Sequence, residues 1–253
     1  MRRTLLGLLI VSLLLAGCGD DDDTVATEET ETATETDTDD GSTTTDRSTS
    51  STTAASSGEL PGERIDIFPY EDTVLAVVGV EAGDVLNVRA APGPGQDVVA
   101  ELDPLADGIS PSGHNRQLDD GSIWAEITAD GVTGWANTAF LAHLGDTDDV
   151  TSQLYPEVAD RPRADTMLQL GEEVAAAIAG SEEPQPDVVV VDGPTVADLG
   201  EITVDVVGFP DDAVLGARVR VFAEPDPGGE SFTVRSVEST TICRRAVSEG
   251  LCV

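Results

Sequence analysis

The chain contains 253 residues, carries a formal net charge of -36 and uses arginine for all 13 of its basic residues. A surface this acidic repels both nucleic acid and anionic membrane lipids, which excludes electrostatic binding to either partner. Hydrophobic residues make up 40% of the chain and aromatic residues only 4%, a composition that favours small β-rich domains over one large core.

The N-terminal end has the features of an export signal. Arg2 and Arg3 precede an apolar run over residues 5–16, and small residues lead from that run into Cys18. The run is shorter than the roughly 20 residues that a membrane-spanning helix needs, so it predicts a secretory signal. An ordinary signal peptide with a cysteine near its end is the alternative.

The stretch Leu15-Ala16-Gly17-Cys18 resembles the lipobox of a bacterial lipoprotein signal. This resemblance implies that residues 1–17 are removed as a signal peptide and that Cys18 receives a diacylglyceryl group. Two acyl chains hold a protein stably, since each buried methylene contributes about 0.8 kcal/mol. We therefore expect a lipid anchor in the cell membrane, with the protein on its extracytoplasmic face in the cell envelope.

Residues 18–59 consist almost wholly of Asp, Glu, Thr, Ser and Ala. Such a segment cannot bury enough apolar surface to offset the entropy lost on ordering it. It predicts a disordered acidic tether, whose roughly 40 residues have a root-mean-square reach of about 35 Å.

The first folded region is expected over residues 72–144. Apolar runs and alternating patterns predict strands, and turn residues separate them. The expected strands cover residues 74–80, 85–89, 98–102, 123–127 and 133–136. Asp130-Gly131 predicts a hairpin turn with positive φ between the last two strands. Loops are expected over residues 91–95 and 104–120, with a short helical turn over 138–141.

Several separated motifs in this region resemble a bacterial SH3 domain of the extracellular type. They are Leu86-Asn87-Val88-Arg89, Pro92-Gly93, Trp124, Gly134-Trp135 and Phe140-Leu141. The resemblance implies a small, strongly bent β-barrel that targets cell-wall peptides or glycans, often beside a hydrolase domain. Residues 104–120 form a longer and more acidic stretch than such domains often carry.

The ligand-binding candidates of this region are Trp124, Trp135, Asn87 and Arg89. Amphipathic rings can line a ligand groove, but Trp135 and Phe140 more often fill the core of a small barrel, with Trp124 evenly balanced between the two. For the two polar residues, interactions within the protein are the favoured interpretation. Asn87 is expected to bond to nearby backbone, and Arg89 is expected to pair with a neighbouring carboxylate.

Neither histidine supports a metal site. His114 is expected in a loop and His143 beyond the last strand, without a second His or Cys at ligand spacing.

A second folded region is expected over residues 164–253, as an α+β domain with one helix on an antiparallel sheet. Asp165 or Thr166 is suited to cap a helix over residues 167–179, which Gly180 ends. Four strands are expected over residues 188–191, 202–207, 217–222 and 232–241. Residues 217–221 alternate between apolar side chains and arginine, so one face of that strand should meet a core and the other face water.

The cysteine count supports an exported protein. The lipid uses Cys18, which leaves Cys243 and Cys252 as a pair in an oxidising compartment. A structural disulfide is favoured over a reactive or metal-binding pair, because no histidine or closely spaced cysteine accompanies them.

These features predict a non-catalytic lipoprotein whose SH3-like module binds peptidoglycan through its peptide. None of the common nucleophile, zinc or phosphate motifs occurs, and no cofactor is expected. The alternative is an envelope protein that assembles with other proteins and has no wall ligand. An exposed aromatic groove on the first region would favour wall binding, and a large apolar patch on the C-terminal sheet would favour assembly.

Overall fold

The computed structural model describes residues 59–181 and 183–253, which belong to one compact unit. The expected signal peptide, Cys18 and all but the last residue of the expected tether lie outside the described residues. Within the described ranges, no helix has the length and apolar character that a membrane crossing requires.

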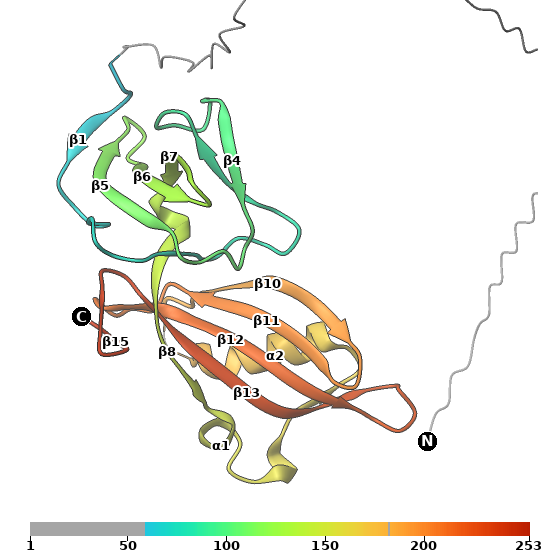
Figure 1. Ribbon diagram of the computed structural model, residues 1–253. Helices are drawn as coiled ribbons and strands as arrows, with labels where there is room; N and C mark the ends of the chain where they lie inside the picture. Colours follow the sequence, from blue (N-terminus) through green and yellow to red (C-terminus); the bar gives the residue numbers. More distant parts are fainter. Residues whose placement is uncertain (1–58, 182) are drawn as a thin grey trace, which may run out of the picture. The chain divides into compact units, whose positions relative to one another are not determined.

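A six-stranded antiparallel sheet forms the N-terminal part of the described chain (Figure 1). Its strand order is β1-β5-β6-β7-β3-β4. The bounds are Glu63–Ile65 for β1, Leu86–Arg89 for β3, Val98–Leu102 for β4, Ser110–Gln117 for β5, Ile123–Ala129 for β6 and Val132–Asn137 for β7. Asp130 and Gly131 have φ values of 50° and 79° between β6 and β7, which confirms the predicted hairpin.

A seven-stranded antiparallel sheet follows, in the order β10-β11-β12-β13-β8-β2, with β9 added beside β13. The bounds are Ala76–Val77 for β2, Leu141–Asp149 for β8, Arg163–Ala164 for β9, Asp187–Val196 for β10, Gly200–Val207 for β11, Val214–Pro225 for β12 and Phe232–Cys243 for β13. Two short strands, Val247–Ser248 (β14) and Leu251–Cys252 (β15), form a C-terminal hairpin.

Helix α2, Met167–Ala179, packs on one face of the seven-stranded sheet. The Thr166 hydroxyl accepts the main-chain N–H of Gln169 at 3.2 Å, and Gly180 follows the last turn with φ of 73°. These caps confirm the predicted helix bounds. Leu170 and Val174 meet Ile202, Val204 and Val219 in the core between helix and sheet. The remaining helical turns are Thr138–Phe140 (η1), Thr151–Leu154 (α1) and Val158–Asp160 (η2).

Strand β8 follows the six-stranded sheet in the chain and belongs to the seven-stranded sheet, and the sequence did not predict it. Its first residues pair with β2 and its later residues pair with β13, so it runs across residue 144, where the first region was expected to end (Figure 1). His143, expected beyond the last strand, is a buried residue of β8 and its Nδ1 lies 2.7 Å from the Val74 carbonyl oxygen.

Strand β5 corrects the expectation of a loop over residues 104–120. It pairs with both β1 and β6, and His114 lies within it. Its buried Asn115 donates from Nδ2 to the carbonyl oxygens of Ile67 and Pro69 at 2.7 and 3.1 Å. The strand is polar, so cross-strand pairing and these bonds hold it in place.

A buried ion pair between Asp205 and Arg218 corrects the expected exposure of β12. Ala217 and Val219 face the core as predicted, but Arg218 is only 8% exposed. Its Nε and Nη2 donate to the Asp205 carboxylate at 2.8 and 2.9 Å, and Nη2 also donates to the Val77 carbonyl oxygen at 2.7 Å. The segment that contains Val77 covers this part of β12.

The predicted disulfide is present between Cys243, at the end of β13, and Cys252 in β15. The main-chain N–H of Asp146 donates to the Gly250 carbonyl oxygen at 2.9 Å. The bridge and this bond hold the C-terminal hairpin against β8.

Candidate ligand groove

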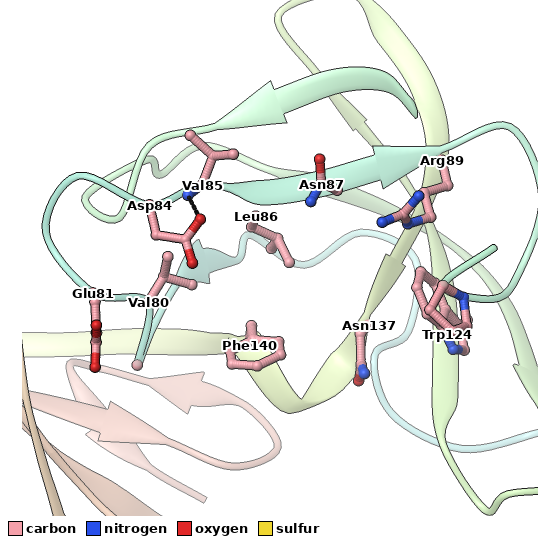
Figure 2. Close-up of a pocket in the computed structure, with 12 residues that line it drawn as sticks. Val80, Glu81, Asp84, Val85, Leu86, Asn87, Arg89, Trp124, Asn137 and Phe140 are labelled. Atoms are coloured by element: carbon pink, nitrogen blue, oxygen red, sulfur yellow. Dashed lines mark hydrogen bonds between the residues drawn. The ribbon is translucent and has the colours of Figure 1, made fainter. Parts of the chain in front are cut away.

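A groove of about 360 Å³ lies beside strand β3 and the turn that precedes it. Figure 2 shows the apolar side chains of Leu86 and Phe140 between charged groups at the two ends. The lining residues are Gly79, Val80, Glu81, Asp84, Val85, Leu86, Asn87, Arg89, Pro94, Trp124, Asn137 and Phe140. The groove therefore brings together three of the four predicted ligand-binding residues, namely Asn87, Arg89 and Trp124.

Arg89 lies at one end of the groove (Figure 2). Its Nη1 donates to the Gln96 carbonyl oxygen at 2.6 Å, and no carboxylate of the described residues forms an ion pair with it. This corrects the expected pairing with a carboxylate. The bond fixes the guanidinium against its own loop, while a guanidinium has five N–H donors in total. Arg89 is thus positioned to bind an acceptor on a ligand.

The hydrogen bonding of Asn87 also differs from the prediction. Its side chain is half-buried and makes no hydrogen bond within the described part of the chain, whereas bonding to local backbone was the favoured interpretation. An amide without an internal partner offers both donors and acceptors to a ligand.

Trp124 forms part of the groove wall although it is only 4% exposed. Its Nε1 donates to the Ser122 hydroxyl at 3.1 Å, which leaves the ring as an apolar surface. Phe140 is 38% exposed, so the core interpretation of this residue was wrong. The neighbouring Leu141, 2% exposed, fills the core position instead.

The turn η1 determines where Phe140 points. The Asn137 side chain accepts the main-chain N–H of Ala139 at 3.0 Å and caps the turn. A capped turn of this kind has a fixed geometry, so Phe140 is presented to the groove by local structure. The Asn137-Thr138 pair was the sequence signal that could have identified this position.

The opposite end of the groove is acidic. Glu81 and Asp84 belong to the tight turn before β3, in which the Asp84 N–H donates to the Glu81 carbonyl oxygen at 3.0 Å. The Asp84 carboxylate accepts the N–H of Val85 at 2.8 Å. Figure 2 shows both carboxylates far from Arg89 along the groove. The groove therefore has a negative end, an apolar middle and a positive end.

Trp135 lies outside this groove. It is 4% exposed and borders a separate hollow with His114, Asn115 and Glu126. The preceding Gly134 permits close packing of β7 on β3, because a Cβ there would lie 2.7 Å from Val88 Cγ1 and 2.8 Å from the Arg89 carbonyl oxygen. The Gly134-Trp135 motif thus supports the strand that carries Arg89.

Among residues 59–181 and 183–253, no group of three or more His, Cys, Asp and Glu side chains is arranged to hold a metal ion. Comparison with family models, with curated proteins and with solved structures gives no significant match. The groove geometry is therefore the basis for a functional proposal.

Proposed function

We propose that this protein is a lipid-anchored, non-catalytic lipoprotein of the cell envelope whose N-terminal β-region is an SH3-like barrel that binds the peptide of peptidoglycan. The groove beside β3 is the observation that carries the proposal. Its aromatic and apolar middle suits a peptide side chain, and its two ends carry opposite charges.

The charge pattern defines how such a peptide would lie. A carboxylate of the ligand would pair with Arg89, and an ammonium group would pair with Glu81 and Asp84. A peptide with one free amine and one free carboxylate satisfies both ends. The chain's overall charge of -36 repels phosphate-rich and carboxylate-rich polymers, so the amine is essential to binding.

The seven-stranded sheet also favours wall binding over assembly. Helix α2 covers its apolar face, and the opposite face carries Thr203, Asp205, Arg218 and Arg220. Exposed large apolar side chains in this part belong to separate segments, such as Val158, Leu168 and Val196. An extended apolar patch was the feature that would have favoured assembly with another envelope protein.

Co-sedimentation of residues 19–253 with purified peptidoglycan tests the groove. Phe140→Ala should weaken binding about fivefold to tenfold, roughly 1 to 1.4 kcal/mol, because it removes the exposed ring from the middle of the groove. Tyr70→Ala is the matched control, since Tyr70 is 51% exposed and lies outside the groove lining. Binding should fall as salt rises.

Equal binding by the two variants, or no sedimentation of the parent chain at low salt, would contradict the proposal. In the second case, recovery of a specific protein from envelope extract would support the assembly alternative.

The anchor is tested separately by Cys18→Ser in the full chain. The variant should leave the membrane fraction, because no diacylglyceryl group can be attached to it. Retention of the variant in membranes after a high-salt wash would show that lipid on Cys18 is not the anchor.

A further inference from the structure

The acidic end of the groove is attached to the seven-stranded sheet. Its carboxylates, those of Glu81 and Asp84, belong to the turn over residues 81–84 (Figure 2). The main-chain N–H of Ala82 in this turn donates to the Val190 carbonyl oxygen at 2.8 Å. Val190 lies in β10, the edge strand of the sheet. The turn thus binds one of the carbonyl groups that an edge strand leaves free.

A second hydrogen bond attaches the segment before the turn to the same sheet. The main-chain N–H of Gly79, which lines the groove, donates to Asp205 Oδ2 at 2.9 Å. Asp205 belongs to β11, which pairs with β10. Two neighbouring strands of the seven-stranded sheet therefore hold residues 79–84, the segment that forms the acidic end.

The basic end and the aromatic middle of the groove are held by nearer contacts. The Arg89 guanidinium donates to the carbonyl oxygen of Gln96, and the turn that carries Phe140 is capped by Asn137. All of these residues lie within 86–140. A change in the contact with β10 should therefore displace the acidic end before it displaces the other two parts.

The turn over residues 81–84 has the geometry of a type II turn. The Asp84 N–H donates to the Glu81 carbonyl oxygen at 3.0 Å, and Gly83 has φ of 86°. Ala82 occupies the second position of this turn, where proline is favoured because its ring fixes φ at the required value.

Proline is the residue that this chain uses at the second position of other turns. Three turns that a similar bond closes, between the first carbonyl and the fourth N–H, carry Pro94, Pro104 and Pro227 there. Proline has no N–H to donate. Ala82 retains the N–H, and this is the group that bonds to Val190.

We propose that strand β10 is part of the recognition site, because it positions the acidic turn for the amine of the ligand. Ala82 is the positioning residue, since its bond to Val190 determines where the carboxylates of Glu81 and Asp84 lie. This role of β10 rests on the proposed peptide binding, because it concerns the same groove. It gives the C-terminal sheet a function, which is to set the preference of the groove for a ligand with a free amine.

The variant Ala82→Pro tests the role of β10, since it removes the bond to Val190 and retains a residue that suits the turn. Residues 19–253 are co-sedimented with purified peptidoglycan, either intact or with its amines acetylated by acetic anhydride. The ratio of the two affinities measures the amine preference. It should fall about threefold to tenfold in Ala82→Pro, because the two exposed carboxylates no longer face the amine. The affinity for acetylated peptidoglycan should change much less.

Asp119→Pro is the matched control. Asp119 occupies the second position of the turn over residues 118–121, which the Gly121 N–H closes on the Leu118 carbonyl oxygen at 2.9 Å, and it lies outside the groove lining. This variant should keep the amine preference of the parent chain.

A background without the two carboxylates shows whether Ala82 acts through them. Glu81→Gln with Asp84→Asn removes both charges, and the amide oxygen at position 84 can still accept the Val85 N–H. This double variant should lose the amine preference, and adding Ala82→Pro should then have no further effect on it.

Hydrogen exchange provides a second measurement if Ala82→Pro does not fold by circular dichroism. Soluble fragments of the intact peptidoglycan should slow exchange of the Gly79 and Ala82 N–H groups in the parent chain more than acetylated fragments do. The reason is that an amine bound to the turn stabilises the bonds that hold it. Equal slowing by the two kinds of fragment would overturn the proposal.

Three sedimentation results would overturn the role of β10 and leave peptide binding in place. They are an unchanged amine preference in Ala82→Pro, an equal loss in Asp119→Pro, and a further loss when Ala82→Pro is added to the background without carboxylates. Failure of the parent chain to sediment with intact peptidoglycan at low salt would instead contradict peptide binding itself, and the role of β10 with it.

Discussion

The face of the seven-stranded sheet opposite helix α2 has one end that other segments of the chain cover and one end that is open to solvent. We call these the covered end and the open end. Each end contains one ion pair between strands β11 and β12. At the covered end, the side chains of Asp205 and Arg218 are 0% and 10% exposed. At the open end, those of Glu201 and Arg220 are 38% and 46% exposed. Arg220 comes two residues after Arg218 in β12, and Glu201 comes four residues before Asp205 in β11, so ion pairs of the same chemistry on the same two strands have opposite surroundings.

The difference arises because segments of the N-terminal region lie over the covered end. The Asp205 carboxylate accepts the main-chain N–H of Gly79 at 2.9 Å, and Arg218 Nη2 donates to the carbonyl oxygens of Val77 and Pro104 at 2.7 and 3.3 Å. These bonds satisfy the two buried charges with backbone from another part of the chain. Burial therefore converts a surface ion pair into a connection between strands β11 and β12 and backbone of the N-terminal region.

The largest expected effect is that of Arg218→Met, which would leave Asp205 buried without its partner. We expect the free energy of unfolding to fall by about 3 to 5 kcal/mol. Arg220→Met is the matched control and should cost less than about 1 kcal/mol, because water screens that pair. Urea unfolding measures both values.

Two signals sharpen this test. Trp124 and Trp135 both lie in the six-stranded sheet, so their fluorescence reports that sheet, while far-UV circular dichroism reports the whole chain. If the covered end couples the sheets, the two signals should change at the same urea concentration in the parent chain. Equal losses for Arg218→Met and Arg220→Met would show that the covered pair has no special role.

A smaller effect is expected from the disulfide, which holds the C-terminal hairpin beside β8. Nine positions separate Cys243 from Cys252 in sequence, and closing so short a loop contributes about 2 to 3 kcal/mol in the loop-entropy model. Reduction, or replacement of both cysteines by serine, should lower the urea midpoint accordingly. Thiol titration of the denatured, unreduced chain of residues 19–253 should find no free cysteine; two free thiols would contradict the bridge.

Local signals in the sequence were sufficient to predict the elements whose structure depends on neighbouring residues. Thr166 and Gly180 mark the bounds of α2, and Asp130-Gly131 marks the hairpin between β6 and β7. Caps and turns act through neighbouring backbone, so no knowledge of the rest of the chain was needed.

Elements that depend on distant partners were not predictable. Strand β5 contains Pro111 and Gly113 and few strand-forming residues, and its pairing with β1 and β6 defines it. The acidic second half of β8 has the composition of a linker, but β13 pairs with it. Arg218 is buried only because Val77 and Pro104 lie over it.

The candidate groove also contains residues that the sequence predicted and residues that it did not. The motif around Asn87 and Arg89 and the aromatic Trp124 identified one wall of the groove. The exposure of Phe140 was missed, because the sequence does not say which of Phe140 and Leu141 enters the core.

The smallest expected effect concerns Asp149, an exposed carboxylate at the far end of β8. Hydrogen bonds from the side chain and main chain of Thr151 lower its pKa from the ordinary value of 3.8. A lowered pKa in the folded state means that this stabilisation is present above pH 3.8 and disappears as the pH falls through the lowered value.

Asp149→Asn should therefore cost less than about 1 kcal/mol at neutral pH, because the amide oxygen still accepts the Thr151 N–H but carries no charge. The stability difference between the parent chain and the variant should shrink as the pH falls below 3.8. Urea unfolding across a pH series measures this difference directly. A difference that stays constant down to the acid limit would show that the charge on Asp149 does not contribute. The contrast with the covered end would then rest on burial alone, because Asp149 and Asp205 both accept main-chain N–H groups.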